Sequence, residues 1–147
     1  MIDIEFKIPE YVIEIGVITG NTERKVNVGL NNAELMFIQE NGSPVNHIPA
    51  RPVLQMTLDY ANKHLLNNAI DKAINSYLIN NFSIQSLEDE LNKLCLRMES
   101  YARHIIYDND GKLVANAPST IAKKGYNHPL FMTGQLARSI TCRLRRI

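Results

Sequence analysis

Two proline-containing segments that lie far apart in the chain constrain its fold more than any other feature. The first, from Ile48 to Leu54, reads IPARPVL, and the second, from His128 to Leu136, reads HPLFMTGQL. Proline fixes its own φ and disfavours the helical region for the preceding residue, so each segment sets the direction in which the next element leaves. Pro52 suits the first position of a helix, and Thr133 suits the cap of a second, short helix. Both segments contain few ionisable groups, which favours a structural role over catalysis.

Apolar residues spaced three and four apart predict two long helices. The first runs from Pro52 to about Tyr77, and the second runs from about Ile84 to Tyr107 with Ser83 as its cap. Because only a short turn around Asn80 and Asn81 separates them, we expect an antiparallel pair. Three shorter helices are expected from Ala33 to about Gln39 with Asn31 or Asn32 as its cap, from Thr120 to Lys124, and from Thr133 to about Arg138.

The two ends of the chain alternate between apolar and polar residues, the pattern of a half-buried strand. Near the start, the alternation runs from Ile2 to Ile8, and Tyr11–Ile18 is rich in β-branched residues. A Thr-Gly-Asn-Thr turn at 19–22 then precedes Lys25–Leu30, so an N-terminal hairpin is expected. Near the end, apolar and polar residues alternate again from Ile140 to Arg145.

These elements predict one α+β domain over residues 1–147, a length that allows one hydrophobic core but hardly two. A terminal strand needs a partner, and the N-terminal hairpin is the only other β structure expected. The C-terminal strand should therefore join the N-terminal sheet, with the antiparallel helix pair packed on one face and short accessory helices around it. The alternation directs Ile140, Cys142 and Leu144 toward the helices and Arg143 and Arg145 away from them.

The composition is that of a soluble globular protein, with 45% hydrophobic and 21% charged residues. A net charge of +1 argues against a chain that binds nucleic acid through its overall charge. Neither a secretory signal nor an apolar run long enough to cross a bilayer is present, so no membrane partner is expected. The two cysteines, Cys95 and Cys142, form no metal-binding pattern and are expected to be reduced, as in a cytoplasm.

The sequence contains no recognisable catalytic or metal-binding motif. The turn Asp108–Gly111 lacks the downstream glutamate of an EF-hand, no G-x-S-x-G motif is present, and the glycines are too isolated for a phosphate-binding loop. His128, beside a proline, is expected to pack or hydrogen-bond in a rigid loop. None of the histidines has ligand spacing (His47, His64, His104 and His128). We therefore predict that the chain is not an enzyme and uses no cofactor, metal or small-molecule substrate.

Arginines provide the only charged features that suggest an interaction. After Gly134 the chain contains four arginines and no acidic residue (Arg138, Arg143, Arg145 and Arg146). This patch is either a solvated strand face or a surface that meets an acidic partner or DNA. Arg51 is different, because a cation beside a helix N-terminus faces the wrong end of the helix dipole. Three arrangements are open for it: exposure to water, a salt bridge with Glu40, or a salt bridge with a neighbouring subunit.

Together with the run Ser119–Gly125 (STIAKKG), the two proline segments resemble the small tail-completion, or neck, proteins of tailed bacteriophages. That family has a glycine-containing loop, an I-P-A-R-P-hydrophobic helix start, an S-T-I-x-x-K-G turn and a P-L-x-x-T-G-x-L-x-x-S-I ending. The same order occurs here in Glu40–Gly42, Ile48–Leu54, Ser119–Gly125 and Pro129–Ile140. The resemblance covers roughly Val28 to Leu144. Three positions depart from the family pattern: Asn41 replaces an aromatic residue, Val53 a phenylalanine and Met132 an aspartate.

The resemblance implies a structural virion protein, assembled in the host cytoplasm and located at the head–tail junction. It implies a homo-oligomeric ring, a hexamer or a dodecamer, that contacts other connector and tail proteins. Seven residues are expected at its interfaces or in the turns that shape them: Pro49, Arg51, Pro52, His128, Pro129, Thr133 and Gly134. The four arginines Arg138, Arg143, Arg145 and Arg146 would line a lumen near DNA or face an acidic partner. The alternative is a small nucleic-acid-binding accessory protein that uses the same arginine patch.

Overall fold

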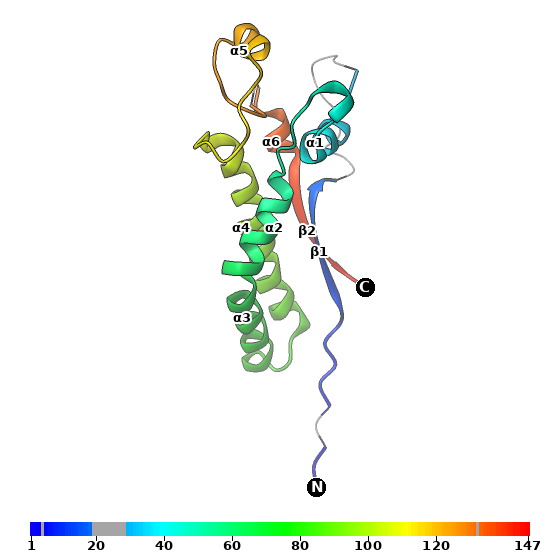
Figure 1. Ribbon diagram of the computed structural model, residues 1–147. Helices are drawn as coiled ribbons and strands as arrows, with labels where there is room; N and C mark the ends of the chain where they lie inside the picture. The colour runs from blue at the N-terminus through cyan, green and yellow to red at the C-terminus, as the bar shows by residue number, and fades with distance from the viewer. Residues whose placement is uncertain (4, 19–28, 132) are drawn as a thin grey trace.

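The structure is a computed structural model that describes residues 1–3, 5–18, 29–131 and 133–147. It is an α+β fold, as predicted, and its described elements are β1 (Tyr11–Val17), α1 (Asn32–Asn41), the 3₁₀ helix η1 (Pro44–Asn46), α2 (Val53–His64), α3 (Leu66–Ile79), α4 (Ile84–Asp108), α5 (Pro118–Lys124), α6 (Gln135–Ser139) and β2 (Ile140–Arg146). Helices α2, α3 and α4 lie along one side of a two-stranded ribbon, and α1, α5 and α6 gather at one end of the molecule (Figure 1).

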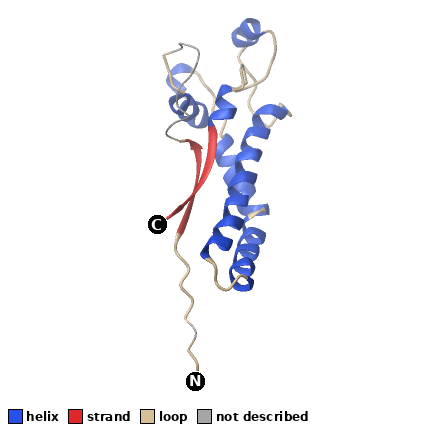
Figure 2. Ribbon diagram, turned by 180° about the vertical axis from the view of Figure 1, so that it is seen from behind, coloured by secondary structure: helices blue, strands red, loops and turns tan. Residues whose placement is uncertain are grey.

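The sheet joins the two ends of the chain, as the alternating pattern predicted. Strands β1 and β2 are antiparallel, in a register that runs from Tyr11 opposite Arg146 to Val17 opposite Ile140. Figure 2 shows the two-stranded sheet from behind, with the helices on one side of it. The second strand of the expected hairpin falls mostly on residues 19–28, outside the described residues.

The expectation of a strand between Ile2 and Ile8 was wrong. The described residues of this segment are extended but belong to no strand. The antiparallel ladder ends with Tyr11 opposite Arg146, and one further bond joins the Ile147 N–H to the Glu10 carbonyl, at 2.9 Å. None of the described residues before Glu10 is paired with β2. The described residues before Tyr11 form the N-terminal arm, Met1–Glu10, which continues beyond the sheet (Figure 1).

Of the two long helices, the second was predicted correctly and the first was not. Helix α4 runs from Ile84 to Asp108, and the Ser83 hydroxyl accepts a bond from the Ser86 N–H at its start. The expected helix from Pro52 to about Tyr77 is two helices, α2 and α3, separated at Leu65, whose φ is −116°. No glycine or proline marks this break, so helical periodicity alone could not reveal it.

The core follows α4 along its length. The largest side chains that are less than 2% exposed are Val53, Thr57, Ile105, Ile106 and Ile140. Near α1 and α6, α4 packs against Met36, Val53, Leu136 and Ile140, and further along it packs against Ala61 and Leu65. Burying one large apolar side chain is worth about 1.5–3 kcal/mol, so the cluster around Ile105 and Ile106 holds α1 and α6 to α4.

The two faces of β2 are oriented as predicted. Ile140 is fully buried, Cys142 and Leu144 are partly buried, and Arg143 and Arg145 are exposed. Cys142 contacts the buried Cys95, and both thiols are free. Their hydrogen bond and their burial raise the pKa of the Cys142 thiol.

Replacing Leu144 with Asp is expected to lower the free energy of unfolding by about 1–2 kcal/mol, because only part of this side chain leaves water on folding. The folded state should survive the change. Urea unfolding followed by circular dichroism measures the loss. The matched control is Arg145→Ser on the exposed face, for which a change within about 0.5 kcal/mol is expected. Equal losses in the two variants would contradict the assignment of the faces.

Candidate interaction site

A tight loop joins α1 to α2 and carries the first proline segment. Ser43 and Ile48 exchange backbone hydrogen bonds of 2.8 and 2.9 Å across η1, which closes the loop. Gly42, which ends α1, has φ 73° and ψ 178°, a region that only glycine occupies readily. A Cβ on Gly42 would lie 2.8 Å from both the Ala50 nitrogen and the Ile48 oxygen. The loop therefore requires glycine both for its backbone conformation and for the close approach of two chain segments.

Helix α2 is capped by a residue of α1. The Glu40 carboxylate accepts hydrogen bonds from the backbone N–H groups of Leu54, at 3.0 Å, and Gln55, at 2.7 Å. A carboxylate at this end also complements the positive end of the helix dipole. Pro52 lies at the cap position, one residue before the helix, and contributes no side-chain bond. Glu40 thus fixes the angle between α1 and α2 and is already engaged by backbone groups.

Arg51 is buried, with only 6% of its surface exposed. Its Nε donates to the Val114 carbonyl at 2.8 Å, its Nη2 to the Ala115 carbonyl at 2.9 Å, and its Nη1 to Gln39 Oε1 at 2.9 Å. All three acceptors are uncharged, and no carboxylate of the described residues forms a salt bridge with the guanidinium. Burial lowers the pKa of Arg51, yet guanidinium remains protonated in proteins. Exposure to water and a salt bridge with Glu40 are therefore both excluded.

The second proline segment is held by contacts with α4 and α5. The His128 ring bonds the Ile106 carbonyl through Nε2 and stacks on Phe131, with ring centroids 4.6 Å apart. This is the packing role expected of His128. The Lys124 ammonium donates to the His128 carbonyl at 2.7 Å. These contacts fix the position of the segment that leads into α6.

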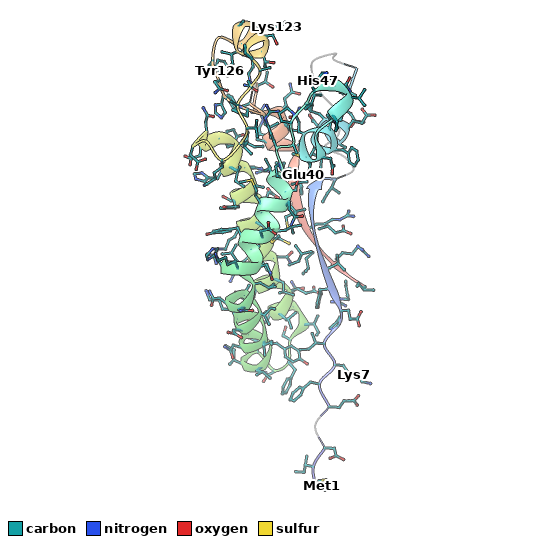
Figure 3. The ribbon with its side chains drawn as sticks, viewed as in Figure 1. Met1, Lys7, Glu40, His47, Lys123 and Tyr126 are labelled. Atoms are coloured by element: carbon teal, nitrogen blue, oxygen red, sulfur yellow. The ribbon has the colours of Figure 1, made fainter. Side chains whose placement is uncertain are left out.

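The two proline segments and the STIAKKG run meet around one cavity of about 500 Å³, here called the motif pocket. Its wall combines residues that are distant in sequence: Leu35, Gln39, Asn46, His47, Ile48, Pro49, Arg51, Asn116, Ala117, Thr120, Lys124, Leu130, Phe131, Thr133, Gly134, Gln135 and Leu136. Figure 3 shows His47, Lys123 and Tyr126 at the same end of the molecule, opposite Met1 and Lys7.

The motif pocket is positively charged. Arg51 and Lys124 line it, and none of its described lining residues is acidic. Burial, and to a lesser extent the nearby charge of Arg51, lower the pKa of Lys124, which indicates that the two cations affect each other. The Asn116 side-chain Nδ2 is a further buried donor, and it has no hydrogen-bond partner among the described residues. Such a cavity favours a ligand that contains a carboxylate or another anionic group.

The predicted interface residues divide into two sets. Pro49, Arg51, Thr133 and Gly134 line the motif pocket, whereas Pro52, His128 and Pro129 are not among its lining residues. The predicted cap of α6 was wrong: Gly134, with φ 75°, occupies the cap position. The Thr133 carbonyl instead accepts a bond from Arg138 Nη2, at 3.0 Å, because the chain turns one residue later than expected.

The arginine patch is compensated within the chain. Both oxygens of Glu14 are engaged, one by Arg143 Nε at 2.6 Å and the other by Arg145 Nη2 at 3.0 Å. Arg146 pairs with Glu88, which also accepts a bond of 2.9 Å from the Tyr11 hydroxyl. Arg138 reaches the Thr133 carbonyl and covers Gly134. Three of the four arginines after Gly134 are therefore paired with two glutamates that the sequence places far away.

The glutamate between Arg143 and Arg145 gives a prediction about pH. Hydrogen bonds from the two arginines lower the pKa of Glu14, so the pairs stabilise the fold above the ordinary glutamate pKa. That contribution is lost as pH falls through the lowered pKa of the folded state. In the double variant Arg143→Gln/Arg145→Gln, the Glu14 pKa, followed by NMR, is expected to rise toward its ordinary value. An unchanged pKa would contradict the pairing. Glu88, paired with Arg146, is the internal control.

Three residues of the motif pocket were not singled out from the sequence. Gln39 and Asn116 lie outside the motifs, and Lys124 lies within the STIAKKG run without a separate role. One signal pointed to such partners: Arg51 is a cation beside a helix N-terminus, so groups elsewhere in the chain had to compensate its charge. Those groups are two backbone carbonyls and the Gln39 side-chain amide. A sequence pattern does not identify backbone carbonyls as partners.

Comparisons with protein-family models, curated proteins and solved structures found no match to this chain. Among the described residues, no helix is long and apolar enough to cross a membrane. The same residues contain no cluster of three or more histidine, cysteine or acidic side chains that would hold a metal ion.

Proposed function

We propose that this chain is a structural subunit of a tailed-phage virion, a neck or tail-completion protein that forms a ring at the head–tail junction. One observation carries the proposal. The segments that resemble the family are distant in sequence, yet they surround one cavity at one end of the domain. Segments that served only as local turns would not need to share a wall.

The surface next to the motif pocket supports assembly. Val45 in η1, which precedes the lining residues Asn46 and His47, is 89% exposed, and Pro49 on the pocket wall is also exposed. Exposed apolar side chains at the edge of a cavity are typical of surfaces that bind other proteins. A rigid loop, closed by the Ser43–Ile48 bridge and supported by Gly42, presents them in one orientation.

The proposal is tested by the mass of the purified protein in solution and by electron microscopy. A closed ring with one stoichiometry, a hexamer or a dodecamer, is expected as concentration rises, and the chain should be found in mass spectra of the assembled virions of a phage that encodes it. A protein that stays monomeric at its highest concentration and is absent from virions would overturn the proposal.

The alternative, a nucleic-acid-binding accessory protein, depends on the arginine patch. Arg143 and Arg145 are each 52% exposed on the outer face of the sheet, but they share the Glu14 carboxylate. Binding to duplex DNA at increasing salt separates the two functions. An accessory protein should bind as a single subunit and lose affinity steeply with salt, whereas a ring subunit is expected to bind weakly or not at all in isolation.

A further inference from the structure

We infer that the start of the N-terminal arm of one subunit, the part before Phe6, binds in the motif pocket of the next subunit. The arm and the pocket are both present in each chain, and they lie at opposite ends of it. The inference rests on the homo-oligomer of the proposed function, and it names the surfaces through which neighbouring subunits meet.

The arm is an extended segment with exposed apolar side chains. Ile2 is 88% exposed, Phe6 is 53% exposed and Ile8 is 43% exposed, and acidic residues occur between them at Asp3 and Glu5. A single exposed apolar residue is ordinary, but several within one extended segment favour a binding function. Extended peptides bind by placing alternate side chains in pockets.

The arm cannot reach the pocket of its own chain. Phe6 packs against Phe82, in the turn between α3 and α4, with ring centroids 5.3 Å apart. Met1 and Lys7 lie at the end of the molecule opposite His47, Lys123 and Tyr126 (Figure 3). Five residues precede Phe6, and an extended chain of that length spans roughly 17 Å. That length is sufficient to enter a cavity on an adjacent subunit.

The chemistry of the arm complements that of the pocket. Asp3 and Glu5 supply carboxylates, and Glu5 lies 3.7 Å from the Lys7 ammonium in an exposed pair within the arm. The pocket supplies Arg51 and Lys124, with no acidic residue of its own among the described lining residues. A guanidinium has five N–H donors, and Arg51 uses three of them within its own chain. The exposed apolar side chains of Met1 and Ile2 match the apolar part of the pocket wall, which is formed by Leu35, Leu130, Phe131 and Leu136.

A contact between opposite ends of identical chains is heterologous, so each subunit uses one arm and one pocket. Such contacts form a ring when the rotation between subunits closes and a filament when it does not. The arm–pocket contact therefore accounts for a homo-oligomer without the two-fold surface that a dimer would require.

Disulfide cross-linking between two differently substituted chains tests the contact directly. One chain carries Ile2→Cys, which leaves both arm carboxylates in place, and the other carries Thr133→Cys on the pocket wall. Oxidation of the mixture is expected to give a covalent heterodimer. The matched control pairs Ile2→Cys with Leu96→Cys, a 65% exposed position on α4 outside the motif pocket, and only background cross-linking is expected. Unsubstituted chain measures the background from Cys95 and Cys142.

The outcomes separate this inference from the proposed function. Oligomers that form without the Ile2–Thr133 cross-link, or with equal yield from the Leu96 control, would overturn the arm–pocket contact and leave the ring proposal standing. A chain that stays monomeric would overturn both.

Charge reversal gives an independent test on the full chain. Asp3→Lys/Glu5→Lys changes only the exposed arm, so the fold should be retained, and oligomers are expected to be lost at concentrations at which the unchanged chain is fully assembled. Adding Lys124→Glu to the same chain is expected to restore assembly, because the pocket then matches the reversed arm. Full assembly of the arm variant, or no recovery in a folded triple variant, would overturn the contact.

Discussion

Gly42→Ala is expected to lower the free energy of unfolding by about 2–4 kcal/mol, through backbone strain and a steric clash. The backbone at this position has φ 73° and ψ 178°, which side chains other than hydrogen do not tolerate. The added methyl group would also lie 2.8 Å from two backbone atoms of the 48–50 segment, and backbone cannot move aside as a flexible side chain can. Urea unfolding followed by circular dichroism measures the loss.

Gly111→Ala is the matched control for this prediction. Gly111 has φ 85°, but a Cβ there meets no atom within 4 Å. Only the cost of the left-handed conformation applies, about 1–2 kcal/mol. If the two variants were equally stable, the 48–50 segment would not pack against Gly42 as described.

Arg51→Met is expected to lower the free energy of unfolding by about 2–4 kcal/mol. The methionine fills much of the same volume, but it leaves the carbonyls of Val114 and Ala115 and the Gln39 amide oxygen without their donor. A buried polar group without a partner costs about 1–3 kcal/mol. Removal of a buried charge offsets part of that cost, and a net loss of stability is expected because three acceptors lose their donor at once.

Arg51→Lys is the control that keeps the charge. Lysine cannot reproduce the fixed fork of guanidinium donors, so an intermediate loss is expected if the three hydrogen bonds stabilise the wall. A stability equal to that of the unchanged chain in the methionine variant would show that Arg51 does not hold the 114–115 segment.

The elements that sequence reasoning predicted well are those with local signals. Ser83 begins α4, and Asn31 and Glu34 form a reciprocal cap at the start of α1. The pairing of the first and last strands followed from alternation and from the shortage of other β structure. In each case the residues that determine the structure lie within the element or at its ends.

The elements that sequence reasoning missed depend on contacts between distant residues. Leu65 interrupts the first long helix without a glycine or proline, at a site buried against Leu94 and Met98 of α4. The arm was predicted to be a strand because Ile2–Ile8 alternates, yet alternation cannot show whether a partner strand is long enough.

In the candidate site too, local features were predicted and contacts between distant residues were not. The proline segments identified the loops that form the pocket, but not that the loops enclose one cavity. Glu40 was considered as a partner of Arg51, and the structure instead assigns it to the cap of α2. Arg143 and Arg145 formed an uncompensated patch in sequence, and they share Glu14 across the sheet because residues 14 and 143 are opposite each other in the register.

Hydrogen–deuterium exchange on dilute and concentrated protein tests the central claim, that subunits assemble through the motif pocket. When oligomers form, slower exchange is expected in two segments that border the pocket and are mostly exposed in the single chain, residues 44–50 and 114–120. The rest of the described chain, apart from the N-terminal arm, should exchange as before. Oligomers in which both border segments exchange as fast as in the dilute protein would contradict the claim, because subunit contacts would then lie elsewhere.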